Sequence, residues 1–217
     1  MQQGLRCHVI GWWPSHPAER LNGVCISNFY HRANNEYGKP WPLPPGSVQP
    51  KELEDVMAWL RVHPQELGAS HILPFVPDAD QIDVEKPEDA PHAKLLHSLA
   101  KITAEAATVQ SAATWVMDHE EWDFMAVYFD AVDHYSHGFM KFHPPHRPHI
   151  PKELYDRWHG VVEGGYRFHD MMLRTLIEKA GPDTTIILCS DHGFHPDHLR
   201  PTGIPDEPAG LAAEHRH

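Results

Sequence analysis

Apolar residues recur with a helical period in three stretches of the chain. Spacings of three and four residues place such side chains on one face of a helix, where they pack against a core. Gly181-Pro182 closes the last stretch, as expected at the end of a helix. We therefore predict helices over about 51–62, from Leu95 to about Asp118, and from Pro151 to about Lys179.

Continuous apolar runs of strand length lie between these helices. The run at 124–129 is typical of a strand covered on both faces, and the run at 184–189 predicts another strand. Shorter strands are expected within 5–13 and at 24–26. The order helix, strand, helix, strand predicts an α/β fold with a mostly parallel sheet and helices on both faces.

Proline-containing stretches interrupt these elements. Residues 35–50 are too rich in proline to form one regular element. Residues 64–92 and 141–151 are interpreted as long connections that contain proline. With 217 residues, the chain is long enough for one domain with a substantial core, so 1–217 is treated as a single α/β domain.

The net charge and the hydropathy of the chain indicate which kinds of binding partner are expected. The net charge of −12 disfavours nucleic-acid polymers and anionic membranes. A small phosphorylated substrate stays compatible with this charge, because bound divalent cations reverse the local field. No apolar run reaches 18 residues, which argues against a membrane span, and the first residues lack the apolar core of a signal peptide. As written, the chain is expected to be cytoplasmic.

Asp191 and His192 follow the predicted strand at 184–189 after Ser190, and Gly193 permits the turn that lets both side chains face one ion. A carboxylate and an imidazole suit zinc, and also manganese or iron. The alternative reading is an Asx turn with an incidental histidine.

Asp133 and His137 follow the predicted strand at 124–129 and are four residues apart. On a helical turn this spacing puts both on one face, so they can share a metal. Asp133 can instead be a helix N-cap, and His134 is an alternative ligand. Asp130 is interpreted as supporting the strand end or capping the turn. Because ligands gather at the carboxyl ends of parallel strands, we expect the two Asp/His clusters to lie together.

The two clusters resemble the type I phosphodiesterase/nucleotide pyrophosphatase branch of the alkaline phosphatase superfamily. The residues that carry the resemblance are Tyr128-Phe129-Asp130-Ala131-Val132-Asp133-His134-Tyr135-Ser136-His137-Gly138, Ser190-Asp191-His192-Gly193-Phe194, Glu214-His215-Arg216 and the segment 9–19. The resemblance implies an alkaline-phosphatase-like fold and two divalent metal ions, with zinc as the first choice.

The resemblance also implies a role for each matching residue. Asp133, His137 and His215 would bind one metal, and Asp191 and His192 would bind the second. An aspartate at the end of a first strand and a Thr or Ser nucleophile would complete the second site. Neither has a match here, so we expect an incomplete domain, the central piece of a longer enzyme, and we name no nucleophile. The threonines at 103, 108 and 114 lie in a predicted helix, in the wrong order relative to the motifs.

We therefore expect a metal-dependent phosphodiesterase or nucleotide pyrophosphatase-like hydrolase that acts on phosphate esters, with weak or absent turnover by this fragment alone. The alternatives are a non-catalytic metal-binding pseudoenzyme, or a sulfatase or phosphomutase of the same superfamily. His195 and His198 follow the second motif and are candidate substrate contacts. Trp12 and Trp13 are interpreted as packing residues. Exposed sheet edges would favour self-association.

Overall fold

The structure is a computed structural model of the chain, and it describes residues 4–33, 36 and 38–194. Its strands are β1 (Cys7–Ile10), β2 (Cys25–Ile26), β3 (Val48–Gln49) and β4 (Phe124–Val127). Its α-helices are α1 (Glu54–Trp59), α2 (Ala69–Ile72), α3 (Ala90–His119), α4 (Ala131–Phe139), α5 (Lys152–Trp158) and α6 (Val161–Ala180). Short 3₁₀ helices span Lys51–Leu53, Pro64–Glu66, Ala79–Gln81, Pro87–Asp89 and Met140–Phe142.

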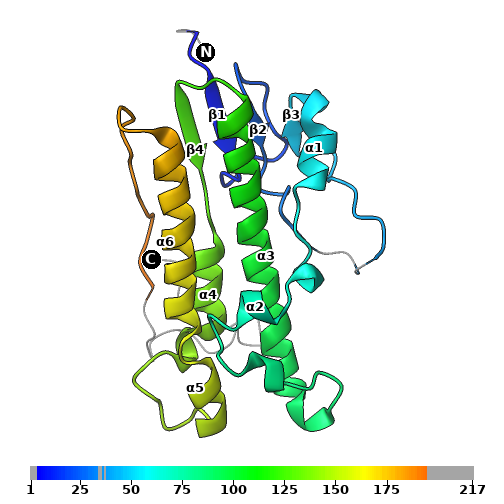
Figure 1. Cartoon of the computed structure of the whole chain (residues 1–217), viewed down its shortest axis with the longest axis vertical. Helices are drawn as coiled ribbons and strands as arrows, with labels where there is room; N and C mark the ends of the chain where they lie inside the picture. The colour runs from blue at the N-terminus through cyan, green and yellow to red at the C-terminus, as the bar shows by residue number, and fades with distance from the viewer. Residues whose placement is uncertain (1–3, 34–35, 37, 195–217) are drawn as a thin grey trace, which may run out of the picture.

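The four strands form one sheet in the order β3-β2-β1-β4. β1 pairs in parallel with both β2 and β4, and only β3 runs antiparallel. Helices α3 and α6 lie side by side over the sheet, and α4 continues from the end of β4 (Figure 1). The fold is α/β with a mostly parallel sheet and helices around it, as the order of predicted elements indicated.

Helix α3 forms the centre of the core against the sheet. Val109, Ala112, Ala113 and Val116 from this helix pack with Ile10 of β1 in one buried cluster. The alanines are small, so the helix axis can come close to the strands. Pro91 in the first turn of α3 fits the helix start, where its missing N–H costs no hydrogen bond.

The three predicted helices are present, but their bounds differ from the prediction. α1 covers Glu54–Trp59 of the predicted 51–62, after the 3₁₀ helix Lys51–Leu53. α3 begins at Ala90, five residues before the predicted start. The predicted helix from Pro151 is two helices, because the chain breaks at His159-Gly160 between α5 and α6. Gly181 ends α6 with φ +77°, the left-handed conformation that favours glycine.

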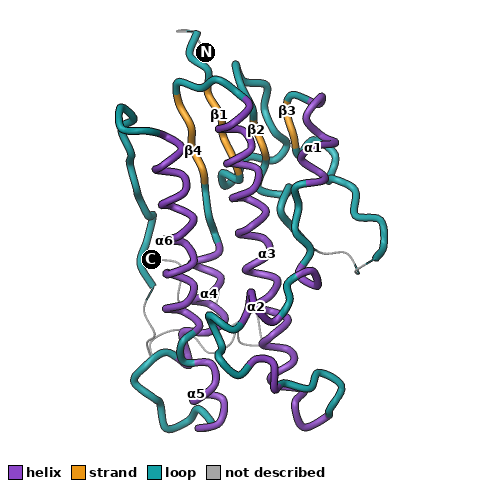
Figure 2. The backbone as a smooth tube through the Cα atoms, viewed as in Figure 1, coloured by secondary structure: helices purple, strands orange, loops and turns teal. Residues whose placement is uncertain are grey.

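The segment at 64–92 is more than an open connection. It forms α2 and three of the 3₁₀ helices (Figure 2). Its apolar residues Ile72, Phe75 and Val76 are buried in a second cluster, together with Tyr135 of α4 and Trp158 of α5. The segment therefore builds the core that supports α4.

The predicted strand at 184–189 is wrong. The segment has no regular structure and pairs with no strand of the described sheet. Ile187 is 83% exposed and Leu188 is 78% exposed, so its apolar residues face solvent. β4 is an edge strand whose first residue, Phe124, is 54% exposed, so the expected cover on both faces of 124–129 is absent within the described residues. An apolar run alone does not create the neighbouring strand that supplies its hydrogen bonds.

Candidate metal centre

The carboxyl ends of β1, β2 and β4 lie at one edge of the sheet, because these three strands are parallel. Helix α4 starts at this edge, directly after β4, and carries Asp133 in its first turn and His137 in its last. Tyr128 extends the β4 ladder by donating its backbone N–H to the carbonyl of Ile10, 3.0 Å away. Side chains from three parallel strands and one helix are thereby brought to the same edge.

Asp133 and His137 face each other across one helical turn, with 3.2 Å between Asp133 Oδ2 and His137 Nε2. Both side chains are partly exposed, at 35% and 46%. The other carboxylate oxygen, Asp133 Oδ1, is buried without a hydrogen-bond partner in the part of the chain that the structure describes. A buried carboxylate oxygen with no partner is expected to bind a cation or a donor from outside that part.

Asp191 and His192 lie on the irregular segment that follows α6, with 3.8 Å between Asp191 Oδ2 and His192 Nε2. His192 Nδ1 lies 2.9 Å from the carbonyl of Gly193. A carbonyl only accepts, so Nδ1 carries the proton and, in the neutral ring, Nε2 has the lone pair that a metal needs. The hydrogen bond to Gly193, followed by the charges of Asp191 and Asp133, raises the pKa of His192.

The two clusters converge in space. Phe194 packs edge-on against His137, with 4.9 Å between the ring centroids. The charge of Asp133 acts on His192, and the pKa of Tyr128 is raised by burial and then by the charges of Asp130, Asp191 and Asp133. The carboxylates of Asp130, Asp133 and Asp191 therefore all lie near the Tyr128 hydroxyl, so negative charge is concentrated at this edge.

The Asp133–His137 pair is close to the spacing of two ligands on one ion. Zinc ligands of this kind bind at about 2.0–2.2 Å, so two of them in a tetrahedral site stand about 3.3–3.6 Å apart. The 3.2 Å between Asp133 and His137 lies just below this interval, and the 3.8 Å between Asp191 and His192 lies just above it. No three ligating side chains surround one point among residues 4–33, 36 and 38–194. His195, His198 and His215 lie outside the described residues, so their assignment stays a prediction.

Other predictions for this region have mixed outcomes. Asp130, and not Asp133, occupies the N-cap position of α4, but its side chain makes no capping hydrogen bond. Thr103 donates to Leu99 O and Thr108 accepts from the backbone N–H of Val62, so both hydroxyls have structural roles. Trp12 and Trp13, which were expected to serve packing, are 43% and 57% exposed, and the Trp12 ring packs against Tyr128.

Sequence reasoning did not single out Tyr128 or His31 as parts of this edge. Tyr128 stands beside Trp12, with 5.8 Å between ring centroids. His31 comes from the loop after β2 and is 4% exposed, with Nε2 at 3.5 Å from Asp130 Oδ2. The position of His31 after a predicted parallel strand was the available signal, but nothing local in the sequence joins it to Asp130.

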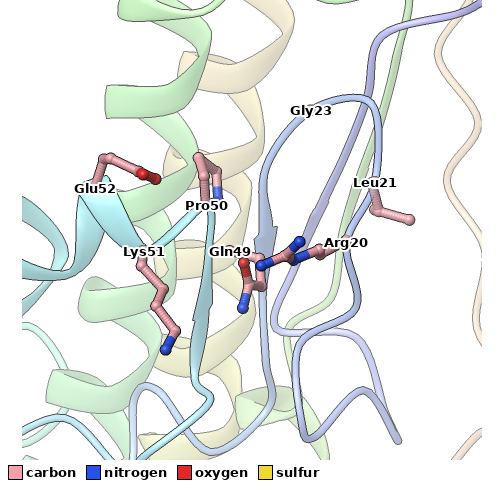
Figure 3. Close-up of a pocket in the computed structure, with 7 residues that line it drawn as sticks. All are labelled: Arg20, Leu21, Gly23, Gln49, Pro50, Lys51 and Glu52. Atoms are coloured by element: carbon pink, nitrogen blue, oxygen red, sulfur yellow. The ribbon is translucent and has the colours of Figure 1, made fainter.

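A hollow of about 350 Å³ lies away from this edge (Figure 3). Its walls come from the loop before β2 and from the junction between β3 and α1, next to the amino end of β2. The lining residues are Arg20, Leu21, Gly23, Gln49, Pro50, Lys51 and Glu52. None of them belongs to the Asp/His clusters, so the hollow is separate from the candidate metal centre.

Comparison with known proteins relates this chain to a family named for phosphodiesterase and nucleotide pyrophosphatase activity. The chain belongs to the type I phosphodiesterase / nucleotide pyrophosphatase family, whose profile matches residues 1–200. Members of this family generally depend on metal ions. The family match confirms the resemblance inferred from the two motifs.

A curated relative extends the comparison. The chain is 31% identical over 78 residues to the human GPI ethanolamine phosphate transferase 3, catalytic subunit. The match covers 36% of this chain and 6% of the human protein, so the chain spans only a small part of that relative's length. No solved structure matches the chain. No helix in the described ranges is long and apolar enough to cross a membrane.

Proposed function

We propose that this chain carries metal-binding side chains of a phosphodiesterase or nucleotide pyrophosphatase-type hydrolase that acts on small phosphate esters with two divalent ions. Zinc is the first choice, with manganese or iron as alternatives. The observation that carries the proposal is the convergence of two Asp/His clusters at one edge of the sheet.

Asp133 and His137 would hold one ion, with His215 as the proposed third ligand, and Asp191 and His192 would hold the other. Divalent ions at these positions would neutralise the charge on the phosphoryl oxygens of the substrate. Without a cation, the carboxylates of Asp133 and Asp191 would repel an anionic phosphate ester, so binding of the substrate should depend on the metal.

Tyr128 is proposed to orient the substrate. A tyrosine phenol is protonated at neutral pH, and burial and the nearby carboxylates raise the pKa of Tyr128 further. A protonated phenol can donate a hydrogen bond to a substrate oxygen. Trp12, exposed beside it, limits the space on one side of the phenol.

A phosphotransferase is the second candidate, because the human protein matched by this chain is named as an ethanolamine phosphate transferase. The same metal-binding side chains serve both reactions, and the acceptor differs: water in a hydrolase, an alcohol in a transferase. Product analysis separates the two. A pseudoenzyme would bind metal with no product of either kind.

The test is the metal content of the purified chain by elemental analysis, comparing the wild type with Asp133→Ala and Asp191→Ala. We expect each variant to lose bound metal. The chain has 20 histidines, so adventitious binding is controlled with Asp55→Ala, which changes an exposed aspartate on α1. Equal metal content in the wild type and all three variants would contradict the proposal.

A further inference from the structure

A contact between the buried His31 and the partly buried Asp130 joins two loops at the sheet edge of the candidate metal centre. His31 follows β2 and Asp130 follows β4, and these strands lie on opposite sides of β1. The His31 side chain is 5% exposed and the Asp130 side chain is 26% exposed. The contact therefore crosses the end of β1 and fixes the loop after β2 to the turn before α4.

The side chain of Asp130 does not cap helix α4, although its position would allow it. Asp130 occupies the N-cap position of α4, where an aspartate ordinarily accepts a hydrogen bond from a backbone N–H of the first turn. Its carboxylate makes no such bond and lies 3.5 Å from His31 Nε2 instead. Its backbone carbonyl still accepts a hydrogen bond from the His134 N–H at 3.1 Å, so Asp130 is part of the helix start. The side chain of this N-cap residue is therefore positioned by His31, which lies outside the helix.

The burial of His31 leaves one polar atom unpaired within the described segments, which is unfavourable for stability. Its second ring nitrogen, Nδ1, is buried without a hydrogen-bond partner among the described residues. An apolar side chain would fill the same space without leaving a buried polar atom unpaired. The carboxylate of Asp130 stays ionised, because the hydrogen bond and charge of His31 and the charge of His134 lower its pKa, although burial alone would raise it.

Asp133 follows Asp130 by slightly less than one helical turn, so a rotation of the helix start moves the Asp133 carboxylate directly. A second histidine steadies the same turn: His169 of α6 packs edge-on against Phe129, with 5.6 Å between the ring centroids. We propose that His31 and Asp130 form a positioning pair, which orients the first turn of α4 so that Asp133 and His137 bind a divalent cation. Neither residue of the pair contacts the cation, and the inference rests on the metal centre of the proposed function.

The probe is Mn²⁺, with its affinity measured by electron paramagnetic resonance on the folded chain and thermal unfolding followed in parallel. His31→Leu removes the donor to Asp130 and keeps the site apolar. We expect the Mn²⁺ affinity to fall about ten- to hundredfold, as is typical when a residue that orients a metal ligand is lost. His31→Gln, which offers an amide N–H to Asp130, should recover most of the affinity, a result that a general packing role would not produce.

Two further variants keep the test decisive. Asp130→Asn preserves volume and removes the charge that His31 contacts, so it should weaken Mn²⁺ binding even if His31→Leu fails to fold. His119→Gln changes an exposed histidine at the far end of α3 and should bind like the wild type. Wild-type affinity in His31→Leu and Asp130→Asn would overturn the pairing role. A wild type that binds no Mn²⁺, Zn²⁺ or Fe²⁺ would overturn the proposed function itself.

Discussion

Replacing Gly165 with alanine tests how closely α6 packs against α4. A Cβ at this position would lie 2.6 Å from Tyr135 Cδ2, about 1 Å inside a normal carbon–carbon contact. Tyr135 is 1% exposed and its hydroxyl lies 2.8 Å from Thr103 Oγ1, so its ring has little room to move. Alanine is better than glycine in a helix by about 1 kcal/mol, whereas overpacking a core costs about 1–3 kcal/mol.

The cost of overpacking should exceed the gain in helix propensity because the obstructing group is a fixed ring. We therefore expect Gly165→Ala to lower the free energy of unfolding, by up to about 2 kcal/mol. Gly138→Ala is the matched control on α4. A Cβ at Gly138 would meet no packing partner within 4 Å, so only the gain in helix propensity remains, about 0.5–1 kcal/mol. Urea unfolding followed by circular dichroism measures both. If Gly165→Ala stabilised the protein as Gly138→Ala should, the close approach of α6 to Tyr135 would be refuted.

Two further predictions concern buried hydrogen bonds. His8 accepts from the backbone N–H of Val24 at Nδ1 (2.8 Å) and reaches the carbonyl of Glu121 through Nε2 (3.2 Å), and burial lowers its pKa. As the pH falls, the unfolded chain therefore binds a proton at His8 before the folded chain does. The free energy of unfolding should be highest above about pH 6.5 and decrease as the pH drops below that value. This decrease should be smaller in His8→Asn, which keeps an acceptor for the Val24 N–H. Thr103→Val should cost about 1–3 kcal/mol, because the buried hydroxyl of Tyr135 loses its partner, and adding Tyr135→Phe should recover most of that loss. A double-mutant cycle by urea unfolding that gives no coupling between Thr103 and Tyr135 would contradict the second prediction.

The parts of the fold that sequence predicted are those fixed by local patterns. The apolar run at 124–129 predicted β4, and the spacing of Asp133 and His137 indicated that they share a face if they lie on a helical turn, as they do in α4. Strand and helix periods act over a few residues, so local sequence reports both. The glycine at 181 marked the end of α6 for the same reason. Local patterns therefore predicted the part of the candidate site that one strand and one helix build.

The parts that sequence missed depend on distant partners. Residues 184–189 have the composition of a strand, but a strand needs a neighbour to accept its hydrogen bonds, and the described sheet ends at β4. Ile72 and Phe75 lie in a segment that reads as a polar connection, yet they are buried because α4 and α5 pack over them. The contact of His31 with Asp130 joins residues that are far apart in the chain, which no window of local sequence reports.

The two Asp/His clusters differ in how the fold holds them, and this difference bears on the proposed metal centre. Asp133 and His137 are fixed by one helical turn, whose start is tied to His31 through Asp130. Asp191 is on a segment without regular structure, and its side chain is 78% exposed. The packing of Phe194 on His137 brings this segment to α4. A cation at this edge would therefore meet one preformed ligand pair and one pair whose position depends on the packing of an aromatic ring, so binding of metal should itself order the second motif.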